Sequence, residues 1–147
     1  YWCSVMMLRG LIVKEPFATL IVKGEKTWEI RKFGTKIRGF IVIISEGYAK
    51  GLVEIYDSKG PLSLSDLEDY YDCHKVPKEF LKKYAGKSQL YIWFLRNAIE
   101  FKKPIKIKVP KGAQVWVRLR KEDIIKILKN EKIMKSILRE LLSSQLL

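Results

Sequence analysis

Three charged residues, Lys26, Glu29 and Arg31, stand within the stretch GEKTWEIRKF at residues 24–33. In an extended strand, Glu29 and Arg31 share the face opposite Trp28, and Lys26, at the turn before the strand, can join them. An arginine fork and a lysine point charge can hold phosphate, and a glutamate between them can orient the arginine or accept from a base amino group. The alternative is a structural Arg–Glu pair that closes one end of a sheet.

A second basic stretch, KKPIKIKVPKG, covers residues 102–112. Alternation along a strand places Lys106 and Lys108 on one face, with further lysines at both ends of the stretch. Such a row can follow a phosphate backbone. It can also protect the edge of a sheet against aggregation. The lysines concerned are Lys102, Lys103, Lys106, Lys108 and Lys111.

The charge of the chain favours a polyanionic partner. Its 29 Lys and Arg against 16 Asp and Glu give a net charge of +13 over 147 residues. The excess is clustered, since residues 101–121 hold eight basic and no acidic side chains, whereas the basic and acidic residues of 41–100 nearly balance. This clustering predicts a polyanion, most often nucleic acid, as partner. A merely basic surface, an acidic small molecule and an anionic membrane are the other interpretations.

Aromatic side chains could supply surfaces on which bases stack. Trp28 lies within the charged stretch and Tyr48 lies near a loop, and both positions suit such contacts. Trp93 and Trp116 occupy alternating strand positions that favour burial in the core.

The cysteine and histidine content gives no sign of a metal or cofactor. Cys3 and Cys73 are far apart, and His74 is the single histidine. Residues adjacent in sequence point in different directions on a helix, so Cys73 and His74 are not expected to form a catalytic pair. No apolar run approaches the roughly 20 residues of a membrane helix, and the N-terminal stretch lacks a secretory pattern. We therefore expect a cytoplasmic protein that does not span a membrane.

The elements that must position these residues are short strands with a few helices. Pro16 and Gly24 bound a helix, Ser63 or Ser65 caps a second, and a third runs from Pro77 to Gly86. The early strands are expected to form a meander, the fourth ending at a turn at residues 58–61. The pattern predicts an α+β chain built around a small β-barrel of about six strands with short helical inserts. The expected strands are 8–13, 27–33, 39–46, 49–58, 88–101, 104–109 and 114–119.

The C-terminal segment, residues 121–147, has apolar residues at helical spacing and predicts an amphipathic helix. We expect it to pack on the barrel or on a partner copy. A homodimer formed through this helix, or an interaction module that docks through it, is therefore an alternative.

The pattern Gly24-x-Lys26-x-x-Glu29-x-Arg31 resembles the G-x-K-x-x-E-x-R signature of the ASCH domain family, within the PUA-like superfamily. Similar segments follow in order, so that the resemblance covers residues 10–119: PFATLIVKG, RGFIVI, GLVEIYD and VWVRL. It implies an ASCH domain over residues 8–120, followed by a helical extension over 121–147. It also implies nucleic-acid binding in a cleft beside the signature. We therefore expect RNA, with single-stranded DNA as the other candidate, to bind around Lys26, Glu29 and Arg31, with Arg38 and the lysines of 102–111 extending the contact.

The resemblance also leaves an enzyme open, a hydrolase of a modified nucleoside or of RNA. The family's acetylcytidine amidohydrolases resemble the chain at Lys26 and have a catalytic glutamate that Glu54 would match. They carry a threonine where this sequence has Glu29. An enzyme of this kind would use Lys26, Glu29 and Glu54.

Overall fold

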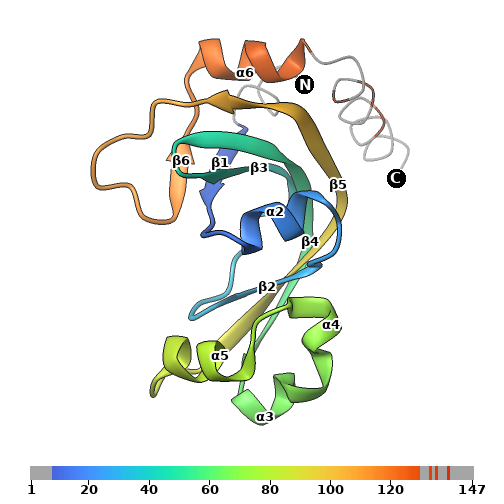
Figure 1. Cartoon of the computed structure of the whole chain (residues 1–147), viewed down its shortest axis with the longest axis vertical. Coiled ribbons are helices and arrows are strands. Elements are labelled where there is room, and N and C mark those ends of the chain that lie inside the picture. Colours follow the sequence, from blue (N-terminus) through green and yellow to red (C-terminus); the bar gives the residue numbers. More distant parts are fainter. Residues whose placement is uncertain (1–7, 130–132, 134, 136–138, 140–147) are drawn as a thin grey trace.

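The computed structural model describes residues 8–129, 133, 135 and 139, which form one curved sheet with helices around it (Figure 1). The strands are β1 (Arg9–Ile12), β2 (Trp28–Arg31), β3 (Gly39–Ser45), β4 (Tyr48–Leu62), β5 (Leu90–Lys106) and β6 (Trp116–Arg118). The helices are α2 (Phe17–Val22), α3 (Leu64–Leu67), the 3-10 turn η1 (Glu68–Tyr70), α4 (Tyr71–His74), α5 (Lys78–Ala85) and α6 (Lys121–Leu128).

The six strands form one mixed sheet in the order β2-β5-β4-β3-β1-β6. The long strands β4 and β5 bend along their length, running from the helices α3–α5 at one end of the molecule to α6 at the other (Figure 1). The sheet is barrel-like but is not closed by pairing between its end strands, β2 and β6. The predicted class, a small α+β barrel of about six strands with short helices, is confirmed.

The predicted meander of the early strands is wrong. β1 pairs in parallel with β3, so that Gly10 lies opposite Val42, and β2 pairs with β5. A parallel pair needs a crossover connection, and the segment that contains α2 and β2 supplies it. β2 is thereby left at the edge of the sheet, with one side free to border a cavity.

Two expected strand ends are also wrong, because bulges let the long strands continue. β4 passes through residues 58–61 and pairs as far as Leu62 with Leu90. β5 includes Pro104 and pairs Ile105 with Ala49, after a shift in register. A bulge absorbs residues that cannot join a regular ladder, so proline does not end the strand here.

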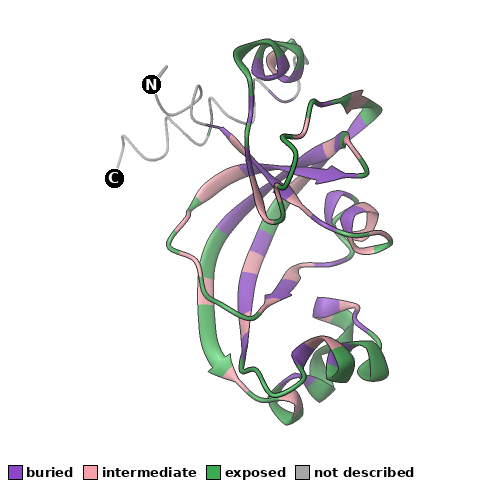
Figure 2. Ribbon diagram, turned by 90° about the vertical axis from the view of Figure 1, so that its left-hand side faces the viewer, coloured by how far each residue is buried: buried purple, intermediate pink, exposed green. Residues whose placement is uncertain are grey.

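Three apolar clusters hold these elements together. Buried residues recur along the long strands (Figure 2). α2 packs on the inner face, where Trp93 is fully buried as predicted and stacks at 5.6 Å on the half-buried Trp116. The α3–α5 insert packs on the other face, over Ile30 and Ile92. The insert therefore lies directly beside β2.

Ile124 and Ile127 of α6 are buried in the third cluster, against the opposite end of the sheet. The expected helix over 121–147 is thus observed over Lys121–Leu128. Nearly all of the remaining tail, and with it most of the helix expected to contact a partner copy, lies outside the described residues. None of the described helices is long and apolar enough to cross a bilayer.

Candidate functional site

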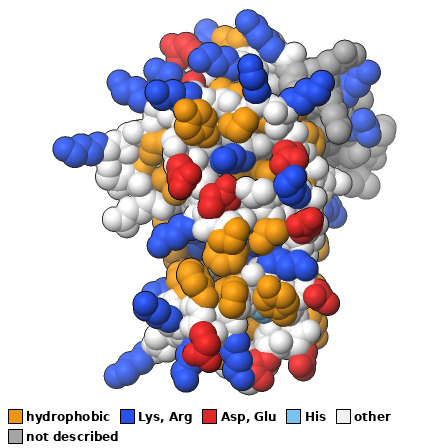
Figure 3. Space-filling model, in the orientation of Figure 1, with side chains coloured by type: hydrophobic (Ala, Val, Ile, Leu, Met, Phe, Trp, Pro, Cys, Tyr) orange, Lys and Arg blue, Asp and Glu red, His pale blue; other side chains and the backbone are white. Residues whose placement is uncertain are grey.

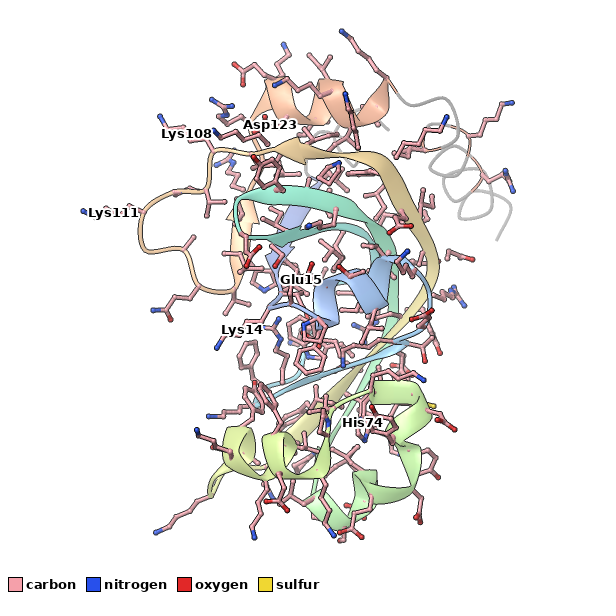
Figure 4. The ribbon with its side chains drawn as sticks, in the orientation of Figure 1. Lys14, Glu15, His74, Lys108, Lys111 and Asp123 are labelled. Carbon is pink, nitrogen blue, oxygen red and sulfur yellow. The ribbon has the colours of Figure 1, made fainter. Side chains whose placement is uncertain are left out.

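Lys26, Glu29 and Arg31 meet at a cavity of about 200 Å³ beside the free edge of β2. α2, β2, α5 and the segments flanking β1 and β6 surround it, and Lys14 lies at its mouth (Figure 4). On this face of the molecule, an apolar patch lies between groups of Lys and Arg side chains (Figure 3). The lining residues are Ile12, Val13, Lys14, Phe17, Lys26, Glu29, Ile30, Arg31, Val76, Phe80, Leu81, Tyr84 and Gln114.

The Glu29 carboxylate lies between two cations. Its Oε2 accepts from Nε of Arg31 at 2.9 Å and from Nη2 at 2.7 Å. Its Oε1 lies 3.5 Å from Nζ of Lys26. Two cations around one buried carboxylate leave a local charge of +1, which suits an anionic or electron-rich ligand.

Lys26 is a buried structural cation, with 1% of its surface exposed. Its Nζ donates to the carbonyl oxygens of Trp28, at 2.7 Å, and of His74, and its third donor faces Glu29. Burial lowers the pKa of the Lys26 amine, and Arg31 lowers it further, whereas Glu29 opposes the shift. An ammonium has three donors, so all of them have acceptors here. Lys26 is expected to fix Glu29 rather than to present its charge at the surface.

Arg31 keeps one nitrogen, Nη1 with its two N–H donors, for a ligand. Besides the pair with Glu29, its Nη2 donates to the carbonyl oxygen of Ile12 at 3.0 Å, which fixes the side chain across the opening of the sheet. Its guanidinium lies 5.6 Å from the centre of the Trp93 ring. Nη1 has no hydrogen-bond partner within the described part of the chain.

Aromatic rings form the walls of the cavity. Phe17 of α2 and Phe80 of α5 meet edge to face at 5.4 Å, and Phe80 remains 47% exposed. Tyr84 lies one helical turn after Phe80 on the same face of α5, and burial raises the pKa of its hydroxyl. These aromatic walls, and Gln114, were missed in the sequence. The i, i+4 spacing of Phe80 and Tyr84 was the available signal.

His74 secures the far side of the site. Its Nδ1 accepts from the backbone N–H of Val76 and its Nε2 donates to the carbonyl oxygen of Leu67, both at 2.9 Å, as expected of a neutral imidazole. Its own carbonyl oxygen accepts from Lys26. Burial lowers the pKa of the His74 ring, although the bond to Leu67 opposes this, and the charge of Lys26 lowers it further.

This environment predicts a loss of stability in mild acid. Since the pKa of His74 is lower in the folded chain than its unfolded value near 6.5, the unfolded chain binds more protons just below that pH. The contribution of His74 to the free energy of unfolding should therefore be constant above about pH 7 and should decrease as the pH drops from 7 to 5.5. Urea titrations should show a steeper fall in stability over this range for the wild type than for His74→Asn, and parallel profiles would contradict the assignment.

Trp28 and Tyr48 lie away from the cavity. Trp28 is half-buried on the opposite face of β2, stacked on Tyr70 at 4.9 Å and edge-on to Phe94 at 5.4 Å. Tyr48 is exposed and pairs across the sheet with Lys106. Tyr48 therefore belongs with the second basic stretch, not with the signature.

The lysines of the second stretch are all exposed. Lys108 points outward near α6, and Lys111 points outward from the tip of the loop between β5 and β6 (Figure 4). The loop that carries Lys111 continues to Gln114 at the cavity. Arg38 is exposed but engaged locally: it donates to the carbonyl oxygens of Thr35 and Ile37 and pairs with Asp57 at 3.6 Å. The predicted contacts thus divide into a cavity and a separate basic surface.

Glu54 does not join Lys26 and Glu29. It lies in the middle of β4 and is absent from the lining of the cavity. Its carboxylate accepts from Arg96 at 3.0 and 3.1 Å and from the Asn97 side chain at 2.9 Å. The three residues expected of a hydrolase are therefore not gathered in this cavity.

A family model for the ASCH domain matches residues 11–105. Among solved structures, the chain is similar to ASCH from Zymomonas mobilis, with a TM-score of 0.70 and 19% identity over 85% of this chain and 96% of that one. The structure of a tyrosine-to-phenylalanine mutant of that protein has a TM-score of 0.69 and 19% identity, over 84% of this chain and 98% of that one. The structure of a serine-to-alanine mutant has a TM-score of 0.66 and 20% identity, over 84% of this chain and 96% of that one. No curated protein sequence matches the chain.

Proposed function

Because the chain belongs to the ASCH domain family, a PUA-like fold that generally binds nucleic acid, we propose that it binds single-stranded RNA with one nucleotide in the cavity beside β2. The observation that carries the proposal is the combination of aromatic walls with an unpaired arginine donor. Single-stranded DNA is the related ligand with which RNA must be compared.

The cavity offers contacts suited to a base. The exposed face of Phe80 and the ring of Tyr84 can stack on a base. Stacking of this kind accepts any of the bases. Arg31 Nη1 can donate to a base carbonyl or a phosphate oxygen, and Glu29, held by its two cations, can accept from an amino group. Because Lys26 and Ile12 hold these groups in place, little side-chain ordering is left for the binding step.

The rest of the RNA would follow the second basic surface. We define this surface as Tyr48 with Lys102, Lys103, Lys106, Lys108 and Lys111. This surface supplies cations and one exposed ring, and the loop that carries Lys111 joins it to the cavity at Gln114. Cations neutralise phosphates and release counterions, which makes binding sensitive to salt.

Hydrolysis has less support from the geometry. A reactive amine at Lys26 would need a free lone pair, but its three donors all face acceptors. Glu54 is held elsewhere by Arg96 and Asn97. We therefore favour binding over turnover.

Neutralising the second basic surface should weaken binding in a salt-dependent way. For the triple variant Lys106→Gln, Lys108→Gln, Lys111→Gln, we expect the plot of log K against log salt to become shallower. Its negative slope should lose about 2 in magnitude, at about 0.7 per phosphate contact. Fluorescence anisotropy with a labelled 12-nucleotide single-stranded RNA, the matching DNA and duplex RNA, at several salt concentrations, measures this slope.

The matched control is Lys59→Gln, Lys83→Gln, Lys87→Gln, which removes the same charge from exposed positions near the opposite end of the molecule. It should leave the slope nearly unchanged. If both triple variants behave alike, the charge acts only as a diffuse field. If neither changes the slope, the assignment of a phosphate-binding surface is wrong.

A further inference from the structure

A second cavity, of about 430 Å³, opens within the α3–α5 insert. It lies on the other side of the insert's wall from the signature cavity, and Val76 and Leu81 line both. Its volume is in the range of roughly 300–1,000 Å³ typical of small-molecule sites. The signature, the basic surface and the proposed RNA contact make no use of it.

The inside of this cavity is apolar. Leu67 and Leu81 are buried at its base, and Leu64 and the exposed ring of Tyr71 complete the walls. The one polar group set deep in the wall is the His74 ring, and both of its nitrogens already have backbone partners. A ligand body that enters is therefore expected to be apolar, since the His74 ring, the buried polar side chain among the described lining residues, already has partners for both nitrogens.

The rim of the cavity is charged, with a positive excess. Lys78 and Lys82 stand one turn apart on the same face of α5, and Glu68 is the one acidic group beside them. Lys78 and Glu68 form a largely solvated pair at 3.5 Å. The Lys82 ammonium has no ion pair or side-chain hydrogen bond with another described residue. The rim can thus hold one anionic group at the mouth of an apolar space.

We propose that this cavity binds a small organic anion with an apolar body, such as a medium-chain carboxylic acid, whose carboxylate pairs with Lys82 and Lys78. The chain enters between α3 and α5, and the carboxylate stays at the solvated rim. This inference does not depend on RNA binding, because the residues that carry it, Leu64, Leu67, Lys78 and Lys82, line this cavity and not the signature cavity.

The test is a titration of the full chain, with methyl groups labelled with carbon-13, by sodium decanoate. The methyl signals of Leu64 and Leu67 report on this cavity alone, whereas Ile30 lines only the signature cavity. We expect saturable shifts of the Leu64 and Leu67 signals, with Ile30 little changed. Decylamine, of equal length and opposite charge, should bind at least several-fold more weakly.

Two double variants separate the rim from the general charge. Lys78→Gln, Lys82→Gln should weaken decanoate binding about 3- to 10-fold, the range of one or two partly solvated ion pairs. Lys83→Gln, Lys87→Gln removes equal charge outside the lining and should not. The proposal is overturned if decanoate shifts Ile30 but not the two leucines, if decylamine binds equally well, if both double variants bind alike, or if no saturable shift occurs at millimolar concentrations.

Discussion

Replacing Lys26 by methionine should lower the free energy of unfolding by about 3 to 5 kcal/mol, the usual cost of removing one partner from a buried ion pair. The substitution keeps most of the side-chain volume but removes every donor. The carbonyl oxygens of Trp28 and His74 would lose their hydrogen bonds to Nζ, and Glu29 would keep only Arg31 as a cation. Equilibrium urea unfolding, followed by circular dichroism, measures the difference.

Lys14→Met is the matched control, because Lys14 lines the same cavity but is exposed. Its stability should stay within about 0.5 kcal/mol of the wild type, as expected of a surface substitution. A loss of less than about 1 kcal/mol for Lys26→Met would show that the amine is not the structural cation that its contacts indicate. A normal fold with lost RNA binding would instead give Lys26 the direct ligand contact that the sequence suggested.

The sequence predicted the part of the site that depends on local geometry. Strand alternation correctly placed Glu29 and Arg31 together, because residues two apart in a strand share a face. It could not show that Lys26 would be buried, since one acceptor is the carbonyl oxygen of His74, 48 residues along the chain. A spacing pattern contains no information about an acceptor on another element.

The walls of the site were missed for a related reason. The helix that carries Phe80 and Tyr84 was predicted from its proline and glycine ends, and α5 spans Lys78–Ala85. Its position over β2 depends on β5, the strand after the insert, which pairs with β2 instead of the expected neighbour β3. Sheet order, unlike strand position, is set by long-range pairing.

Removing the Phe80 ring should weaken RNA binding without changing its salt dependence. Stacking of a base on an aromatic side chain contributes about 1–3 kcal/mol, so Phe80→Ala should cost roughly 5- to 150-fold in affinity. No charge is removed, and the slope of log K against log salt should equal that of the wild type. The same anisotropy titrations across salt concentrations measure both the affinity and the slope.

Phe33→Ala is the control that makes this result interpretable. Phe33 and Phe80 are similarly exposed, at 45% and 47%, and each has one edge-to-face partner, Trp93 and Phe17. Phe33 lies outside the lining of the cavity, so its loss should leave affinity nearly unchanged. Equal losses for both variants would point to general apolar contact, and no loss for Phe80→Ala would remove the cavity from the RNA-binding surface. A loss confined to Phe80→Ala, with the slope preserved, would separate base stacking in the cavity from phosphate contact along the lysines.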